Sequence, residues 1–189
     1  NVTFDSVDEY WNPVWGEESE IRNNYNEMFV ELQQIESERK VNIRFRLFDD
    51  SLGFRYEFPL QEKLGSFIVI DEKTEFAMAG DHTAMWIPGD YDTQEYNYTT
   101  SKLSEIEKKS IEFREENVSM YRFSNLAVQT ALMMKSENGI YINIHEAALI
   151  EYSAMHLEFN PKNMTFESHL TPDAYGNMAY MNAPHNTPW

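Results

Sequence analysis

The chain has 189 residues, 42% of them hydrophobic and 14% aromatic, and its seven glycines and seven prolines exclude collagen-like and low-complexity classes. This length is sufficient to bury a substantial core. Thirty-two acidic residues against fifteen basic ones give a net charge of -17. Such a field repels phosphate backbones, so nucleic acid is not expected as a partner, and a solvated acidic surface is the favoured interpretation of the charge.

The sequence contains no cysteine, which excludes disulfides and thiolate metal sites. No apolar run approaches the roughly 18 residues that a transmembrane helix needs, and the first residues lack the charged and apolar regions of a signal peptide. We therefore expect a soluble segment without a membrane span, or the mature or excised part of a longer protein.

The first half of the chain is dominated by alternation of apolar and polar residues. Residues 1–24 show no sustained period, and we expect an irregular segment pinned by Trp11 and Trp15. Residues 25–33, 41–47 and 54–58 then alternate with period two between short polar turns. This pattern predicts three consecutive antiparallel strands of a meander.

The middle of the chain is less regular. Residues 67–70 and 74–79 predict two short strands, whereas residues 80–96 form an irregular aromatic stretch that Pro88 and Gly89 interrupt. Residues 102–117 are the most charged part of the chain. They predict a short helix or an exposed loop, and we favour a surface excursion between strands.

The clearest element of the second half is a hairpin around Asn138 and Gly139, a pair that suits a two-residue turn because both residues tolerate positive φ. Residues 126–135 and 140–149 flank the turn. After it, Ile140, Ile142 and Ile144 fall on one face, and Tyr141, Asn143 and His145 fall on the other.

Continued alternation places Glu146 on the isoleucine face, where a carboxylate must be paired, hydrogen-bonded or bound to a metal. The pattern favours a pairing with Arg or Lys over a metal role. Calcium is the natural metal for a carboxylate, but it takes six to eight ligands, which one strand cannot supply, so the others would come from elsewhere, such as a partner domain. If the strand ends at Ile144, the carboxylate lies instead at the rim of the sheet.

A second hairpin is predicted from residues 155–159 and 164–168, which flank Asn160 and Pro161. Beyond Pro172 the chain becomes irregular, and residues 183–189 read as an extended strap onto another element. With about eleven or twelve strands and at most one short helix, the fold class is mainly β, a large sandwich.

The residues by themselves indicate little catalytic chemistry. The sequence has no phosphate-binding loop, helical zinc motif or nucleophile elbow, and its five histidines are dispersed. Adjacent acidic pairs such as Glu17-Glu18 point opposite ways on a strand, whereas general acid/base chemistry needs two carboxyl groups facing one bond. Aromatic residues such as Trp86 and Tyr91 could stack on sugar rings, but core packing or an interdomain contact is the favoured interpretation.

Six ordered motifs together resemble one known family. They are Trp11-Asn12-Pro13-Val14-Trp15-Gly16, Gly53-Phe54-Arg55-Tyr56-Glu57-Phe58-Pro59, Thr74-Glu75-Phe76, Trp86-Ile87-Pro88-Gly89-Asp90-Tyr91-Asp92, Tyr141-Ile142-Asn143-Ile144-His145-Glu146-Ala147-Ala148-Leu149 and Asn186-Thr187-Pro188-Trp189. In this order they resemble the N-terminal domain of glycoside hydrolase family 97, a family of α-glucosidases and α-galactosidases. The resemblance covers essentially the whole chain.

The resemblance implies an antiparallel β-supersandwich like that of galactose mutarotase, packed on a (β/α)8 barrel that carries the catalytic carboxylates. It also implies an active-site calcium, to which this domain contributes one glutamate, matched here to Glu146. Trp86, Asp90, Tyr91 and His145 become candidates for contact with the α-glycoside substrate or with the barrel. A periplasmic or other extracytoplasmic location rests on the resemblance alone.

Family members carry further strands before the first motif and continue towards the barrel after the last one. Residues 1–189 are therefore expected to be a partial N-terminal domain, incomplete on its N-terminal side and inactive without the barrel. Two alternatives stay open, a carbohydrate-binding module and a purely structural module in which Glu146 forms an internal salt bridge. Neither glucoside against galactoside specificity nor the stereochemistry of the reaction can be predicted from this domain.

Overall fold

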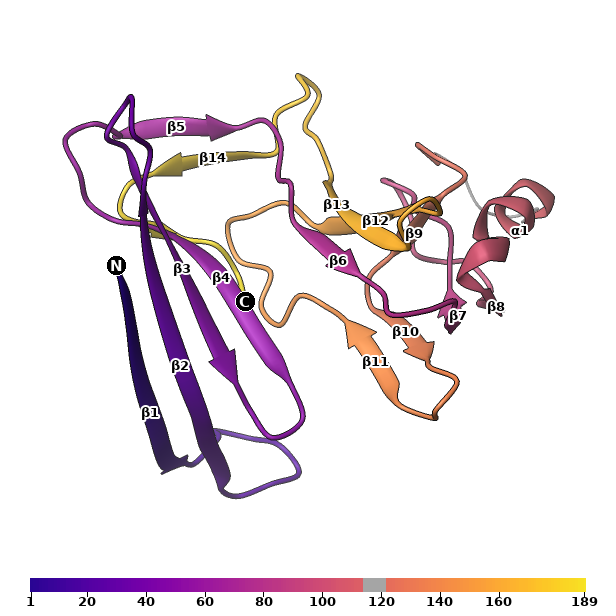
Figure 1. The fold of residues 1–189 in the computed structure, drawn as a ribbon, viewed down its shortest axis with the longest axis horizontal. Helices are drawn as coiled ribbons and strands as arrows, with labels where there is room; N and C mark the ends of the chain where they lie inside the picture. The colour runs from indigo at the N-terminus through magenta and orange to yellow at the C-terminus, as the bar shows by residue number, and fades with distance from the viewer. Residues whose placement is uncertain (114–121) are drawn as a thin grey trace. The chain divides into compact units, whose positions relative to one another are not determined.

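The computed structural model describes residues 1–113 and 122–189 (Figure 1). Within these ranges it contains fifteen strands, a single turn of 3-10 helix and one α-helix. The chain divides into two compact units, unit 1 with residues Asn1–Phe67 and Tyr180–Trp189, and unit 2 with residues Ile68–Ala179. No helix in the described ranges is long and apolar enough to cross a membrane.

Unit 1 is built on a five-stranded antiparallel sheet with strand order β1-β2-β3-β4-β15. Its strands are β1 (Val2–Trp11), β2 (Ile21–Gln33), β3 (Lys40–Leu47), β4 (Leu52–Phe58) and β15 (His185–Asn186). The long arrows of β1 to β4 lie side by side in Figure 1. The predicted three-stranded meander is confirmed as β2, β3 and β4, which pair in consecutive antiparallel registers.

The prediction of an irregular segment over residues 1–24 is wrong, because β1 pairs with β2 along its whole length, from Val2 opposite Val30 to Trp11 opposite Ile21. Polar residues fall on both faces of β1, and almost all of its side chains are exposed. A strand at the edge of a sheet needs no buried face, so it can lack the apolar alternation by which strands are recognised.

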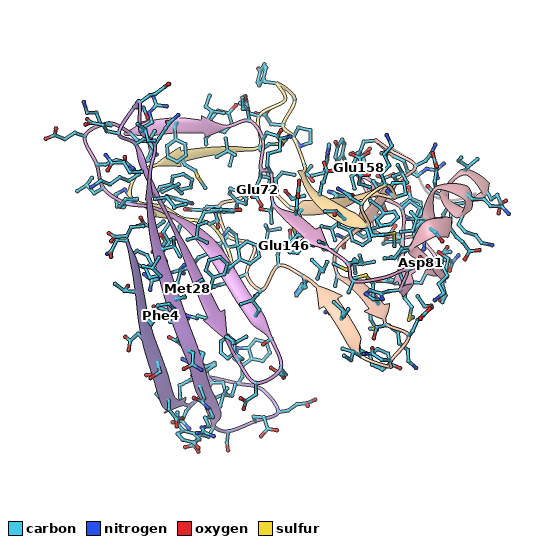
Figure 2. The ribbon with its side chains drawn as sticks, in the orientation of Figure 1. Phe4, Met28, Glu72, Asp81, Glu146 and Glu158 are labelled. Carbon is cyan, nitrogen blue, oxygen red and sulfur yellow. The ribbon has the colours of Figure 1, made fainter. Side chains whose placement is uncertain are left out.

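The two faces of this sheet differ in chemistry. On one face the guanidinium of Arg44 lies 4.4 Å from the ring centroid of Phe29, and the buried carboxylate of Glu57 accepts hydrogen bonds from Arg44 and Arg55. On the other face Phe4 of β1 stands directly opposite Met28 of β2 (Figure 2). The alternation of β3 accounts for this division, since its odd-numbered residues are apolar and its even-numbered ones are polar or charged.

The predicted C-terminal strap is confirmed within unit 1. β15 pairs with β4, and the residue after it, Thr187, forms two hydrogen bonds with Tyr56. The Thr187 N–H donates to the Tyr56 carbonyl at 2.9 Å, and the Tyr56 N–H donates to the Thr187 hydroxyl oxygen at 3.0 Å. Trp189 then lies over the sheet with its ring 4.3 Å from the guanidinium carbons of both Arg46 and Arg55. The last of the six motifs thus packs on the second.

Unit 2 contains two four-stranded antiparallel sheets, with orders β11-β10-β7-β8 and β6-β13-β12-β9. Their strands are β6 (Glu75–Ala77), β7 (Thr83–Trp86), β8 (Thr99–Lys102), β9 (Ala127–Gln129), β10 (Leu132–Lys135), β11 (Tyr141–Ile144), β12 (Met155–Asn160) and β13 (Thr165–Leu170). Apolar side chains from both sheets form one core, including Trp86, Leu132, Met134, Leu157, Phe159 and Phe166. The mainly β, antiparallel sandwich class is confirmed.

The charged stretch 102–117 forms a short helical segment where the structure describes it, namely η1 (Leu103–Glu105) and α1 (Ile106–Glu112). Ile106 lies in the core of unit 2, so the segment is anchored rather than a free excursion. The end of the predicted excursion, from residue 114 onwards, lies outside the described residues.

Both predicted hairpins are confirmed, as β10 with β11 and as β12 with β13. The prediction that a two-residue turn closes the first hairpin is wrong. The Ser136 N–H donates to the Ile140 carbonyl at 2.9 Å, the Gly139 N–H donates to the Ser136 carbonyl at 3.0 Å, and three residues, 137–139, make the turn. Gly139 adopts φ 88°, and one left-handed glycine after an ordinary turn closes a three-residue hairpin loop.

The remaining strands are β5 (Ser66–Val69) and β14 (Ala179–Asn182), which form a two-stranded sheet. The predicted short strands at 67–70 and 74–79 correspond to β5 and β6. Besides β1, two strands were not predicted, β7 inside the aromatic stretch and β14 beyond Pro172. Both are only four residues long and adjoin turn residues, so their alternation is too brief to stand out.

Candidate functional site

Glu146 lies just after the end of β11, on the stretch that leads from β11 to β12 (Figure 2). The strand ends at Ile144, as the alternative interpretation of the pattern required. Tyr141 is exposed, Ile144 is buried and Glu146 is half-buried, so the predicted alternation holds from Tyr141 to the carboxylate, whereas Ile140 at the start of the predicted strand is exposed.

Both carboxylate oxygens of Glu146 accept a hydrogen bond from the protein. The Thr130 hydroxyl donates to Oε2 at 2.6 Å, and the Met155 backbone N–H donates to Oε1 at 2.5 Å. Thr130 stands between β9 and β10, where the chain passes from one sheet of unit 2 to the other, and Met155 is the first residue of β12. The carboxylate thus joins the ends of strands from both sheets.

The salt bridge that the pattern favoured for Glu146 is not among the ion pairs of residues 1–113 and 122–189. Hydrogen bonds, rather than a basic side chain, satisfy the carboxylate. No group of three or more His, Cys, Asp or Glu side chains in the same ranges could hold a metal ion. The oxygens of a carboxylate are ligands that calcium prefers. Glu146 would supply one of the six to eight ligands of a calcium ion, and the others would have to come from elsewhere.

Asp90 is 2% exposed and holds the loop that follows β7. Its Oδ1 accepts the backbone N–H groups of Asp92 at 2.8 Å and Thr93 at 3.2 Å, and its Oδ2 accepts the Tyr96 hydroxyl at 2.6 Å. Burial and the hydrogen bond to Asp90 both raise the pKa of Tyr96, which keeps that phenol protonated. This use of the Asp90 carboxylate is structural.

Tyr91 belongs to a cluster of stacked rings. Its hydroxyl lies 2.5 Å from Nε2 of His169, and its ring stacks on Phe123 with centroids 4.8 Å apart. His156 meets Tyr91 and Phe123 edge-on, at 5.7 and 5.6 Å. His156 and His169 are cross-strand partners in β12 and β13, a pairing that their separation along the chain did not reveal.

Burial lowers the pKa values of His156 and His169, so both imidazoles are neutral near pH 7. The Nε2 of His156 lies 2.8 Å from the Asp90 carbonyl, which can only accept, so Nε2 carries the proton. The negative charge of Glu146 opposes the lowering of the His156 pKa. The ring cluster and the Glu146 carboxylate are thus electrostatic neighbours within unit 2.

The two remaining candidates are Trp86 and His145. Trp86 is 1% exposed, and its Nε1–H donates to Ser101 Oγ at 3.0 Å, so its indole belongs to the core. His145 is exposed beside Glu146. The structure therefore brings Asp90 and Tyr91 together, keeps His145 with Glu146, and places Trp86 in the interior.

Sequence reasoning missed the two residues that hold Glu146. Thr130 and Met155 carry no motif, and neither is charged. The sequence carries no signal for either residue, because Thr130 lies between two strands and Met155 contributes only its backbone N–H.

Comparisons with known proteins agree on one family. The family model described as glycosyl-hydrolase 97 N-terminal matches residues 1–189. A retaining alpha-galactosidase from Bacteroides thetaiotaomicron is 26% identical over 201 residues, covering 97% of this chain and 28% of its own length.

Among solved structures, a glycoside hydrolase family 97 enzyme from Pseudoalteromonas sp. strain K8, in complex with acarbose, is 31% identical with a TM-score of 0.82, covering 100% of this chain and 26% of that one. A beta-arabinopyranosidase has a TM-score of 0.77 at 18% identity over 100% of this chain and 30% of that one, which shows a shared fold. The chain spans about a quarter of the length of the alpha-galactosidase and of the family 97 enzyme that it matches. With the family model matching from end to end, the chain belongs to the glycoside hydrolase family 97 N-terminal domains.

Proposed function

We propose that this chain is the non-catalytic N-terminal domain of an α-glycoside hydrolase, an α-glucosidase or α-galactosidase. In the intact protein it would pack on a catalytic (β/α)8 barrel and lend Glu146 to an active-site calcium. Two named relatives support the reaction class, the retaining alpha-galactosidase and the family 97 enzyme in complex with acarbose. An extracytoplasmic, periplasmic location goes with this proposal and is tested by cell fractionation.

One observation carries the role of Glu146. Its carboxylate is half-buried and fixed through both oxygens, yet no basic side chain among residues 1–113 and 122–189 forms an ion pair with it. An oriented carboxylate without a basic partner can serve a divalent cation as a ligand. Glu72 is held in the same way by two neutral donors, so the geometry permits the role, and the resemblance of residues 141–149 to the family motif assigns it to Glu146 rather than to Glu72.

The chain's own contribution to the reaction is binding and orientation. Glu146 would present the unused lone pairs of its oxygens towards the barrel, because one lone pair on each oxygen is already taken by Thr130 or Met155. Bound calcium would supply the orientation of sugar hydroxyls and the neutralisation of negative charge. Proton transfer and attack at the glycosidic bond belong to the barrel carboxylates.

The test is Glu146→Gln in the full-length protein. Calcium affinity, measured by isothermal titration calorimetry after chelator treatment, should weaken roughly tenfold or more, because calcium affinity follows the number of charged ligands. Hydrolysis of p-nitrophenyl α-glucoside or α-galactoside should fall in parallel at limiting calcium, while circular dichroism shows an intact fold.

Glu72→Gln is the matched control. Glu72 is also a half-buried glutamate of unit 2, and its two oxygens accept hydroxyl hydrogen bonds from Thr74 at 2.6 Å and Tyr152 at 2.7 Å. Its replacement should leave calcium affinity unchanged. If Glu146→Gln binds calcium as the wild type does and only lowers stability, the chain is a structural module and the metal role is wrong.

A further inference from the structure

We infer that Thr130 is the positioning residue of the calcium ligand Glu146, an inference that rests on the proposed function. The Thr130 hydroxyl would hold the carboxylate in one rotamer so that its free lone pairs face the cation. Thr130 itself would touch neither calcium nor substrate.

The first argument is the direction of the hydrogen bond. Thr130 Oγ1 has one proton and two acceptors within reach, Oε2 of Glu146 at 2.6 Å and the Met155 carbonyl at 3.0 Å. A charged acceptor at the shorter distance wins the proton. The hydroxyl therefore points at the carboxylate.

The second argument is that the three residues close a ring. Met155 donates its N–H to Oε1 of Glu146 at 2.5 Å, and its carbonyl lies beside the Thr130 hydroxyl. The backbone of Met155 is itself fixed, because it begins β12 and pairs with Leu170 of β13. Glu146 is thus held at both oxygens, once by a backbone group and once by a side chain.

The third argument is the place of Thr130 in the chain. Thr130 follows β9, whose last residue Gln129 pairs with His156 of β12, and it precedes β10, which pairs with β11. The residue therefore lies in the connection between the two sheets of unit 2, within hydrogen-bond distance of both Met155 and Glu146.

Holding the carboxylate matters for affinity. A free glutamate side chain loses conformational entropy when it binds a cation, because it is fixed in one rotamer. If a neighbouring residue already holds the glutamate in that rotamer, binding carries less of this entropic cost. Hydrogen-bond partners of metal ligands typically change metal affinity by about 10- to 100-fold when they are removed. The inference therefore predicts that replacing Thr130 weakens calcium affinity more than replacing a threonine far from Glu146.

The experiment compares three variants of the full-length protein. Thr130→Val keeps the shape and removes the donor, Thr130→Ser restores a hydroxyl, and Thr74→Val removes an equivalent hydroxyl that donates to Glu72 Oε1 at 2.6 Å. Calcium dissociation constants are measured by isothermal titration calorimetry and by terbium luminescence. We expect about tenfold weaker binding for Thr130→Val, recovery towards wild type for Thr130→Ser, and no change for Thr74→Val.

A second readout separates positioning from general destabilisation. At saturating calcium, kcat of Thr130→Val should approach the wild-type value, whereas at limiting calcium the activity should fall. Melting temperatures of Thr130→Val and Thr74→Val should drop by similar amounts, since each loses one hydroxyl bond to a half-buried carboxylate. If the two variants are equally destabilised and only Thr130→Val binds calcium more weakly, the loss of stability cannot explain the weaker binding.

The outcomes distinguish the inference from the proposed function. Weak calcium binding in Glu146→Gln together with normal binding in Thr130→Val would overturn the role of Thr130 alone. Normal binding in both variants would overturn the proposed function and the inference with it. If Thr130→Val does not fold, the comparison of Thr130→Ala with Thr130→Ser decides, and equal calcium affinities in that pair would count against positioning.

Discussion

The guanidinium of Arg55 lies over the indole ring of Trp189, 4.3 Å from its centroid. Arg46 approaches the same indole at the same distance, and Trp189 also packs on Gly53, where an added Cβ would lie 3.5 Å from the ring. The final residue is thereby fixed on β3 and β4 of the sheet of unit 1.

Replacement of Trp189 by Ala should loosen the C-terminal strap. Each cation–π contact contributes about 0.5–1 kcal/mol, and with the lost packing we expect a total of about 2 kcal/mol. Hydrogen–deuterium exchange of the β4 and β15 peptides in the full-length protein should accelerate, because Thr187 would no longer be held against Tyr56. Trp15→Ala is the control, since Trp15 is 88% exposed, and it should leave the exchange of these peptides unchanged.

Gly89 should not tolerate a side chain. A Cβ at this position would lie 2.5 Å from the Ala127 Cβ and 3.1 Å from the Ala127 carbonyl carbon. The Gly89 N–H donates to the Ala127 carbonyl at 2.8 Å, so the two backbones cannot separate without losing this bond. Gly89→Ala should destabilise unit 2 by about 1–3 kcal/mol, measured by denaturant unfolding. Gly65→Ala, where no atom lies within 4 Å of the added Cβ, should be close to neutral.

The hydrogen bond between Tyr96 and Asp90 should contribute measurably to stability. Asp90 is almost fully buried, so Tyr96→Phe leaves one carboxylate oxygen without its hydroxyl donor and should cost about 1–3 kcal/mol. Because burial and Asp90 raise the pKa of Tyr96, its phenol should stay protonated in an alkaline titration followed by absorbance until the protein unfolds. Tyr98→Phe, at an exposed position, should change stability by less than about 0.5 kcal/mol.

The ring cluster should make stability depend on pH. Burial lowers the pKa of His156 and His169 in the folded state, so the unfolded chain binds more protons, and stability rises with pH through this range. The contribution is fully present above the unfolded value of about 6.5 and is lost as the pH falls below it towards the folded values. The groups that face His156 are Asp90 and Glu146, which raise its pKa, and His169, which lowers it.

The measurement is the free energy of unfolding between pH 7 and 5. His156→Gln should lower stability at pH 7 and flatten the pH dependence, whereas the exposed His145→Gln should keep the wild-type slope. A slope that is equally steep in His156→Gln would show that other groups, such as the carboxylates of this acidic chain, control the acid sensitivity.

Strands with a buried face could be predicted from the sequence, and strands without one could not. β3 alternates Val41, Ile43 and Phe45 with Asn42, Arg44 and Arg46, and its bounds differ from the prediction by one residue. β1 is exposed on both sides and was missed. Apolar and polar residues alternate because one face of a strand is buried. An edge strand that is held by backbone hydrogen bonds and exposed on both faces therefore shows no alternation.

The sequence by itself determined the family, the mainly β class and the half-buried strand that precedes Glu146, because motif order and alternation are local properties of the chain. Only the tertiary structure decided what holds Glu146. Thr130 reaches it from the connection between β9 and β10, Met155 reaches it from the start of β12, and His156 faces His169 through the register of β12 and β13. Register depends on turn length and on pairing between distant segments, since a shift of one residue turns every side chain to the other face.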